Sequence, residues 1–169
     1  ISYAGADLAI NCAVGSVSID AGGSSSGADI VYLWNGPGIT PANQNDLNPQ
    51  NLTTPGIYTL TVNNLQNACS STDIVVIQID TLPPLANIGV PDILNCFNNG
   101  VITLDASASA SGPNIALLWS GPGIMPGEEN AVKPQVSQPG MYQLVVSDNA
   151  NFCTSTAQVM VEEDLEAPT

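Results

Sequence analysis

One stretch of the sequence occurs twice, and it decides the fold: Trp34-Asn35-Gly36-Pro37-Gly38-Ile39 returns as Trp119-Ser120-Gly121-Pro122-Gly123-Ile124. A second motif follows each copy, as Pro55-Gly56-Ile57-Tyr58 and as Pro139-Gly140-Met141-Tyr142. The first motif repeats after 85 residues and the second after 84, so a loop between them has lost one residue. Because self-similarity at a fixed period marks a repeated structural unit, the sequence predicts two copies of one module.

The joint between the two copies falls near Asp80-Thr81-Leu82-Pro83-Pro84. We therefore predict modules at residues 1–82 and 83–169. Two consecutive prolines favour a stiff, extended connection between modules. Asp164-Leu165-Glu166-Ala167-Pro168 is the counterpart of this joint at the other end of the second copy. This correspondence leads us to expect further modules beyond the two described by this sequence.

Short stretches of alternating apolar and polar residues account for most of each copy. The predicted strands are 8–10, 17–21, 30–34, 58–62 and 72–79 in the first copy, and 101–105 and 142–146 in the second. Turn-forming Gly, Pro and Asn separate them, and no window shows a helical apolar stripe. The predicted fold is all-β, with two tandem immunoglobulin-like β-sandwich modules in an extended array.

The aromatic residues of the repeated motifs are predicted to be buried. Trp34 and Trp119 end β-branched or apolar strands, and Tyr58 and Tyr142 begin alternating ones. Sugar-stacking is the alternative role for exposed tryptophans, but large aromatic side chains in strands are more often core residues.

The charge balance limits the possible partners. The chain has one basic residue, Lys133, against 15 acidic residues, for a net charge of −14. Nucleic-acid binding requires clustered Lys and Arg, and anionic membranes would repel this chain. With a single basic residue, we predict no nucleic-acid partner. No run of 18 apolar residues is present, so we also predict no direct membrane insertion.

Four cysteines, two per copy, indicate disulfides. Cys12 recurs as Cys96 and Cys69 as Cys153, each 84 residues later. Zinc is disfavoured because the chain has no His and no closely spaced cysteines. The favoured pairs are Cys12–Cys69 and Cys96–Cys153, which give each module its own bridge; a pair between modules stays open. Disulfides place the protein in an oxidising, extracellular compartment.

The ordered motifs resemble a known family. The pattern Cys, Leu/Ile-Asp-Ala, Trp-x-Gly-Pro-Gly, Pro-Gly-x-Tyr-x-Leu-x-Val and Cys-x-Ser-Thr, from about Tyr3 to Pro168, is similar to the PKD-like and HYR-like immunoglobulin-type repeats. Such repeats fill large surface adhesins of Gram-negative gliding bacteria. The resemblance implies a location at the bacterial cell surface, a stalk or adhesive role, and no catalytic activity.

Several residues are candidates for a cation or for modification. Asp20, Asp80, Asp105 and Asp164 lie near strand ends or junctions and offer the oxygen ligands that Ca²⁺ prefers, although no Ca²⁺-binding loop motif is present. We predict no other cofactor. Asn51 fits the N-glycosylation pattern, and Thr81 lies in a sequence that resembles a bacterial O-glycosylation motif.

We predict that the chain is not an enzyme, because it has no His and only one Lys to activate a nucleophile. The leading function is a structural spacer or stalk of a large secreted or surface adhesin or filament. Its partners would be neighbouring repeats of the same polypeptide. The alternatives are glycan or protein binding through loops 22–27 and 36–45, and self-assembly with other copies through edge strands such as 72–79.

Overall fold

The computed structural model describes residues 1–166, and no helix occurs in that range. The chain divides into two compact units, Ile1–Thr81 and Leu82–Thr169, called the first and second module below. This boundary lies one residue before the predicted one. Regular structure in the described range is β-strand alone, so the prediction of an all-β fold is confirmed. Ala167 and Pro168 of the predicted second linker lie outside the described residues.

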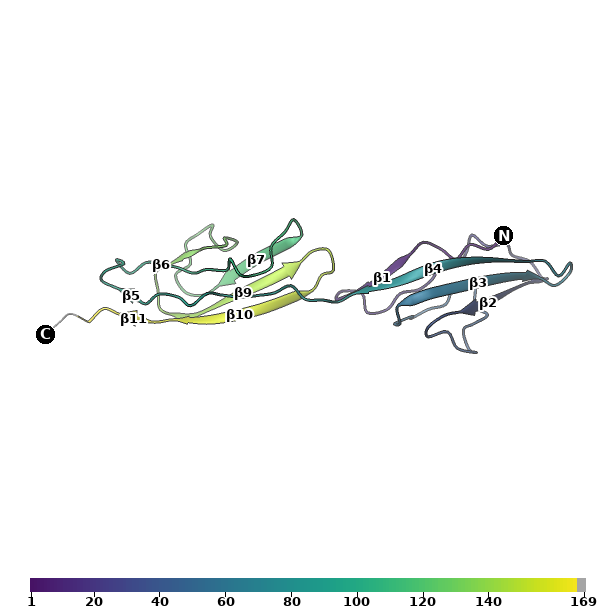
Figure 1. The fold of residues 1–169 in the computed structure, drawn as a ribbon, viewed down its shortest axis with the longest axis horizontal. Coiled ribbons are helices and arrows are strands. Elements are labelled where there is room, and N and C mark those ends of the chain that lie inside the picture. Colours follow the sequence, from purple (N-terminus) through teal and green to yellow (C-terminus); the bar gives the residue numbers. More distant parts are fainter. Residues whose placement is uncertain (167–169) are drawn as a thin grey trace. The chain divides into compact units, whose positions relative to one another are not determined.

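The first module is built around one four-stranded sheet. Its strands are β1 (Leu8–Asn11), β2 (Ile30–Asn35), β3 (Gly56–Asn64) and β4 (Ser70–Asp80), in the order β1-β4-β3-β2. β3 is antiparallel to both β2 and β4, and these three strands lie side by side in Figure 1. β1 runs parallel to β4, so the first and last strands of the module are neighbours.

A second, shorter layer faces this sheet. Val17 and Leu52 exchange two backbone hydrogen bonds of 2.9 and 2.8 Å, and the N–H of Ile19 donates to the carbonyl of Pro49 at 3.0 Å. The strand predicted over 17–21 is thus wrong in extent, since only the bridge at Val17 forms. Pro49 interrupts the opposite segment because proline has no backbone N–H to donate. The two layers make the immunoglobulin-like sandwich, with its first strand returning beside its last.

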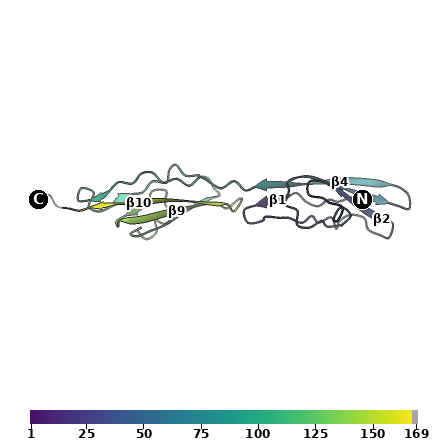
Figure 2. The ribbon, with the colours of Figure 1, turned by 90° about the horizontal axis from the view of Figure 1, so that it is seen from below.

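The second module repeats this pairing with more breaks. β7 (Ile115–Ser120), β9 (Gly140–Asp148) and β10 (Thr154–Val161) form a sheet in the order β10-β9-β7. The remaining strands pair in twos: β5 (Leu94–Asn95) is parallel to β11 (Glu163–Asp164), and β6 (Ile102–Thr103) is antiparallel to β8 (Gln135–Val136). Figure 2 shows strands of both modules in a view turned by 90°.

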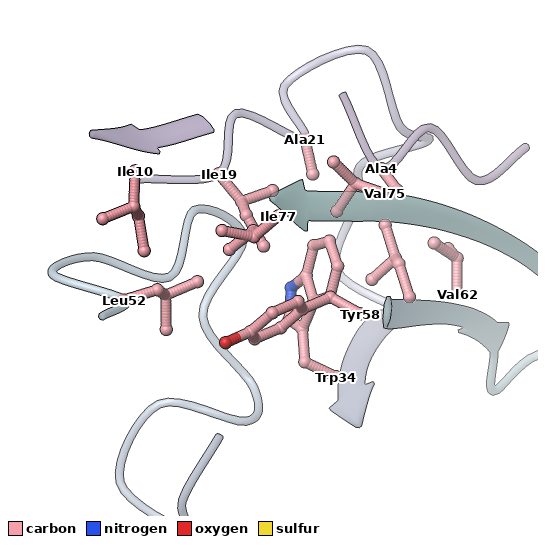
Figure 3. Close-up of a cluster of buried hydrophobic side chains, with 11 residues drawn as sticks. Ala4, Ile10, Ile19, Ala21, Trp34, Leu52, Tyr58, Val62, Val75 and Ile77 are labelled. Carbon is pink, nitrogen blue, oxygen red and sulfur yellow. The ribbon is translucent and has the colours of Figure 1, made fainter. Parts of the chain in front are cut away.

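Each module has its own apolar core. Trp34 and Tyr58 belong to the core cluster of the first module, together with Ile19 and Ile77 (Figure 3). Trp119 and Tyr142 belong to the core cluster of the second module. All four aromatic side chains are at most 2% exposed, so the prediction that they are core residues is confirmed.

Candidate functional site

The repeated tyrosines, Tyr58 and Tyr142, close each sandwich with hydrogen bonds. The hydroxyl of Tyr58 donates to the carbonyl of Thr54 at 2.7 Å, four residues earlier in the chain. Tyr142 donates to the carbonyl of Gln138 at the same distance and also contacts the carbonyl of Pro122. A tyrosine that bonds back to the backbone at the start of its strand is the tyrosine corner of immunoglobulin-like folds. It stabilises the turn and presents nothing to a ligand.

The two repeated motifs pack directly against each other. A Cβ atom at Gly36 would lie 2.6 Å from the Tyr58 ring, and one at Gly56 would lie 2.7 Å from the Pro37 ring. Gly56 also has a φ of 145°, a conformation that side-chain-bearing residues rarely adopt. The glycines therefore allow the close approach of the Trp-x-Gly-Pro-Gly and Pro-Gly-x-Tyr segments, which explains why the two motifs recur together.

Replacing Tyr58 by Phe should lower the free energy of unfolding of the first module by about 1 kcal/mol, because one partly buried hydrogen bond is lost. Chemical denaturation followed by peptide-resolved hydrogen exchange measures this loss. Tyr3→Phe is the control, since Tyr3 is 46% exposed. Equal stability of the Tyr58→Phe and Tyr3→Phe variants would show that the tyrosine corner contributes nothing.

The same burial predicts a loss of stability at alkaline pH. Burial raises the pKa of Tyr58 and of Tyr142, because the folded modules disfavour a buried phenolate. The stability that the two neutral tyrosines contribute to the folded state is fully present below the unfolded pKa of about 10. It is lost as pH rises through the folded pKa. Denaturation midpoints measured from pH 8 to 11.5 should fall less steeply in the Tyr58→Phe/Tyr142→Phe variant than in the wild type. Identical slopes would contradict the prediction.

The four cysteines are in two different states. Cys12 and Cys153 are disulfide-bonded, whereas Cys69 and Cys96 are exposed free thiols. The predicted pairs Cys12–Cys69 and Cys96–Cys153 are therefore wrong.

Strand length explains why no bridge forms within the first module. Cys69 directly precedes β4, whereas Cys12 follows Asn11, which pairs with Asp80 at the far end of β4. The 11 residues of β4 separate the two cysteines, a distance of about 35 Å at ~3.3 Å per residue. A disulfide requires Cα atoms less than about 7 Å apart. The second module has the same arrangement, since Cys153 precedes β10 and Cys96 follows β5, which pairs with β11.

The acidic residues proposed as calcium ligands do not gather within a module. Gly5 is packed against the backbone of Asp20, and the N–H of the adjacent Ala4 donates to Asp73 at 2.8 Å. Asp20 therefore lies near the Asp73 part of β4, about 23 Å along that strand from Asp80 at ~3.3 Å per residue. Among residues 1–166, no three His, Cys, Asp or Glu side chains are close enough together to hold a metal ion.

Asp105 is engaged by its own module. Ser107 donates its backbone N–H to the Asp105 carboxylate at 2.8 Å, and Lys133 Nζ lies 2.9 Å from the other oxygen. Hydrogen bonds from Ser107 and the contact with Lys133 hold the pKa of Asp105 well below its usual range. The pair is largely exposed and so contributes little to stability. Asp164 lies in β11 and is exposed.

The predicted modification sites are accessible. Asn51 is exposed and has a positive φ of 57°, beside the buried Leu52. Thr81 is exposed directly after β4, where its carbonyl lies 3.9 Å from the Cys12 sulfur. Modification of either residue stays a prediction. No helix in the described part of the chain is long and apolar enough to cross a membrane.

One hollow on the second module was not predicted from the sequence. It has a volume of about 370 Å³ and is lined by Ser107, Ser109, Ser111, Leu117 and Asn130, among others. Leu117 corresponds to Tyr32 of the first module, whose hydroxyl donates to the carbonyl of Ser25 at 3.0 Å. The hollow thus lies where the first module places a phenol ring. The mismatch between Tyr32 and Leu117 was the available sequence signal.

Replacing Leu117 by Tyr should fill this hollow and raise the free energy of unfolding of the second module by about 1 kcal/mol, as cavity-filling substitutions do. Denaturant titration measures the gain. Leu118→Tyr is the matched control, because Leu118 is the next residue of β7 and is 54% exposed. A Leu117→Tyr variant no more stable than Leu118→Tyr would contradict the interpretation of the hollow.

Comparison with known proteins gives similarity in structure but not in sequence. No family model matches the chain, and no curated protein matches it. Among solved structures, it is similar to the Sidekick-1 immunoglobulin domains 1–5 (TM-score 0.46, 11% identity, 97% of this chain and 38% of that one). It is also similar to the N-terminal eight Ig domains of Down Syndrome Cell Adhesion Molecule (TM-score 0.48, 13% identity, 97% of this chain and 24% of that one). Three N-terminal domains of the bacteriophage RB49 Hoc protein align with a TM-score of 0.43 and 14% identity, over 96% of this chain and 57% of that one.

This chain therefore spans less than two thirds of each of these structures. Strand order and the tyrosine corner, rather than these alignments, define the class: all-β domains of immunoglobulin type. The PKD-like or HYR-like subfamily stays a prediction.

Proposed function

We propose that these modules are structural spacers in the stalk of a large extracellular adhesin or filament, of the PKD-like or HYR-like kind found at the surface of gliding bacteria, and that they have no catalytic role. Their role is to transmit mechanical force along a polypeptide. Their partners are the neighbouring repeats of that polypeptide.

The path of the chain through the first module carries this proposal. Ile1 lies at the same end as Cys69, since both line one hollow and Ser25 donates its N–H to the Ile1 carbonyl at 3.0 Å. We call this the leading end. Asp80 lies at the opposite, trailing end, at the far end of β4. A chain that begins at one end and leaves at the other suits modules strung in series.

The pairing of β1 with β4 would carry tension between those ends. Four consecutive residue pairs join these parallel strands, from Leu8 with Ile77 to Asn11 with Asp80. A force along the chain loads their hydrogen bonds in shear, so that several must break together. The disulfide-bonded cysteines support an oxidising, extracellular location.

Binding through loops is the second candidate, and the hollow beside Leu117 is the observation that favours it. Apolar groups and three serine side chains line it, as in a small polar-ligand site. If it binds a glycan or peptide, Leu117→Tyr abolishes that binding and Leu118→Tyr does not.

The spacer role is tested by pulling the full chain from its two ends under reducing conditions, with all cysteines as thiols. We expect two separate unfolding events that resist force. Leu8→Pro and Ala9→Pro are made singly, because successive residues of a parallel strand direct their N–H groups to opposite sides. One of them should remove a β1–β4 hydrogen bond and weaken only the first module.

The second module is the internal control, because its strands are unchanged in both variants. Unfolding without measurable resistance, or equal resistance of the wild type and both proline variants, would contradict the force-bearing role of the β1–β4 pair.

A further inference from the structure

Resting on the second candidate function, binding through loops, we propose that the hollow beside Leu117 is a site for a phenol ring. Its occupant is a tyrosine side chain of a partner protein. The hollow is lined by residues of β7 and of loop 107–112, so everything that defines the site lies within the second module. The ring would be held by apolar contact, and its hydroxyl would donate one hydrogen bond to the loop.

The first module shows what fills the equivalent place. Tyr32 lies in β2, the counterpart of β7, and its hydroxyl donates to the carbonyl of Ser25 at 3.0 Å. The phenol ring therefore reaches from the strand to the loop, and it packs against the first core. Leu117 packs against the second core in the same way. A leucine has no ring and no hydroxyl to reach the loop, and the hollow is the space that remains.

The loop that receives the hydroxyl has the same backbone in both modules. In each copy, the N–H of its third residue donates to the carbonyl three residues earlier at 2.9 Å, and the first strand residue donates to a glycine carbonyl at 3.2 Å. That glycine has a φ of 153° in the first module and 148° in the second. These pairs are Ser24 with Ala21 and Ile30 with Gly27 in the first module, and Ser109 with Ala106 and Ile115 with Gly112 in the second.

The carbonyl of Ala110 is the acceptor that corresponds to that of Ser25. The N–H of Ser25 donates to the carbonyl of Ile1 at 3.0 Å, and the N–H of Ala110 donates to the carbonyl of Leu85 at 2.8 Å. Both residues are thus held by equivalent bonds. Ala110 lines the hollow, and within residues 1–166 no N–H or hydroxyl donates to its carbonyl. A phenol hydroxyl in the hollow would give this carbonyl the bond that Tyr32 gives to Ser25.

The lining suits a neutral aromatic ring better than a sugar. None of the described residues that line the hollow is charged, although the chain has 15 acidic residues. Apolar contact comes from Ala106, Ile115 and Leu117. The Ser109 hydroxyl is already engaged, since it accepts the N–H of Asn87 at 2.9 Å and donates to the carbonyl of Asn87 at 2.7 Å. A sugar would bury several hydroxyls that need partners, which is costly, whereas a phenol needs one.

The size of the hollow also fits a single ring. Its volume of about 370 Å³ lies at the lower end of the range of small-ligand pockets, which is roughly 300–1,000 Å³. Tyrosine is enriched where proteins meet, because its ring is apolar and its hydroxyl needs only one partner. A tyrosine side chain presented by another protein therefore matches the hollow in shape, polarity and hydrogen bonding.

The experiment is a titration of the full chain with N-acetyl-L-tyrosinamide, an uncharged carrier of the tyrosine side chain, followed by backbone N–H signals in NMR spectra. We expect binding in the millimolar range, with signal shifts confined to the hollow, including Ala110 and Leu117. Ser25 and Tyr32 should not shift, because their ring already fills the equivalent place. N-acetyl-L-phenylalaninamide should bind about fivefold more weakly, since it lacks a hydrogen bond of about 1 kcal/mol.

Three variants locate the site. Leu117→Tyr should abolish the shifts, because its own ring would fill the hollow, whereas Leu118→Tyr should leave them unchanged. Tyr32→Leu is the reciprocal variant and should create a second site, with new shifts at Ser25. Tyr32 is only partly buried, and the second module folds with leucine at this position. Unchanged N–H signals of β3 and β4 would verify that Tyr32→Leu keeps its fold.

Methyl α-D-glucopyranoside is titrated in parallel as the sugar probe. Equal binding of the tyrosine and phenylalanine probes, or shifts that survive Leu117→Tyr, would overturn the proposal. Sugar binding without tyrosine binding would overturn the phenol site and leave loop binding standing, whereas binding of neither probe would overturn both. The spacer role is tested separately, because none of these results changes the resistance of the β1–β4 pair to force.

Discussion

Alanine in place of Trp34 should unfold the first module while the second stays folded. Trp34 is 2% exposed at the centre of the first core, and truncating a buried Trp to Ala costs about 3–5 kcal/mol. A module of this size has about 4–12 kcal/mol of stability in total, at ~0.05–0.15 kcal/mol per residue. The substitution therefore removes a large share of that stability.

Peptide-resolved hydrogen exchange measures this outcome directly. Peptides from β3 and β4 should exchange much faster in Trp34→Ala, whereas those from β9 and β10 should keep their wild-type rates. Trp119→Ala is the matched variant and should reverse the pattern, since Trp119 has the same place in the second core. Slow exchange of β3 and β4 in Trp34→Ala would contradict the assignment of Trp34 as the central core residue.

Gly56→Ala should destabilise the first module by about 2–6 kcal/mol. The new methyl group would lie 2.7 Å from the Pro37 ring, and overpacking of this kind costs about 1–3 kcal/mol. The φ of 145° adds backbone strain of about 1–3 kcal/mol for any residue with a side chain.

Gly15→Ala is the control for this substitution. A Cβ atom at Gly15 meets nothing within 4 Å among the described residues, so we expect a change within about 0.5 kcal/mol. Denaturant midpoints of the two variants give the comparison. Equal midpoints would show that the two motifs do not depend on close packing.

Features that depend on local sequence were predicted well. Strands predicted at 30–34, 58–62 and 72–79 occur as β2, β3 and β4, with longer ends. Their alternation reflects one buried face, a signal contained within each segment. The aromatic core residues were predicted for the same reason.

Features that depend on pairing between distant segments were not predicted. The cysteine pairs failed because sequence shows that Cys12 and Cys69 share a module but not that they lie at opposite ends of β4. The parallel pairing of β1 with β4 sets that separation, and no local pattern encodes it. The length of the strand predicted over 17–21 was overestimated, because sequence alone does not show that this segment faces Pro49, which has no N–H to donate.

The central claim is that these modules are links of a long extracellular stalk. The most direct test is the intact mass, under reducing conditions, of the native polypeptide that contains this sequence. We predict a mass many times the 17.3 kDa of the two modules. A native polypeptide of 17.3 kDa would contradict the claim and indicate a small subunit that assembles with other copies.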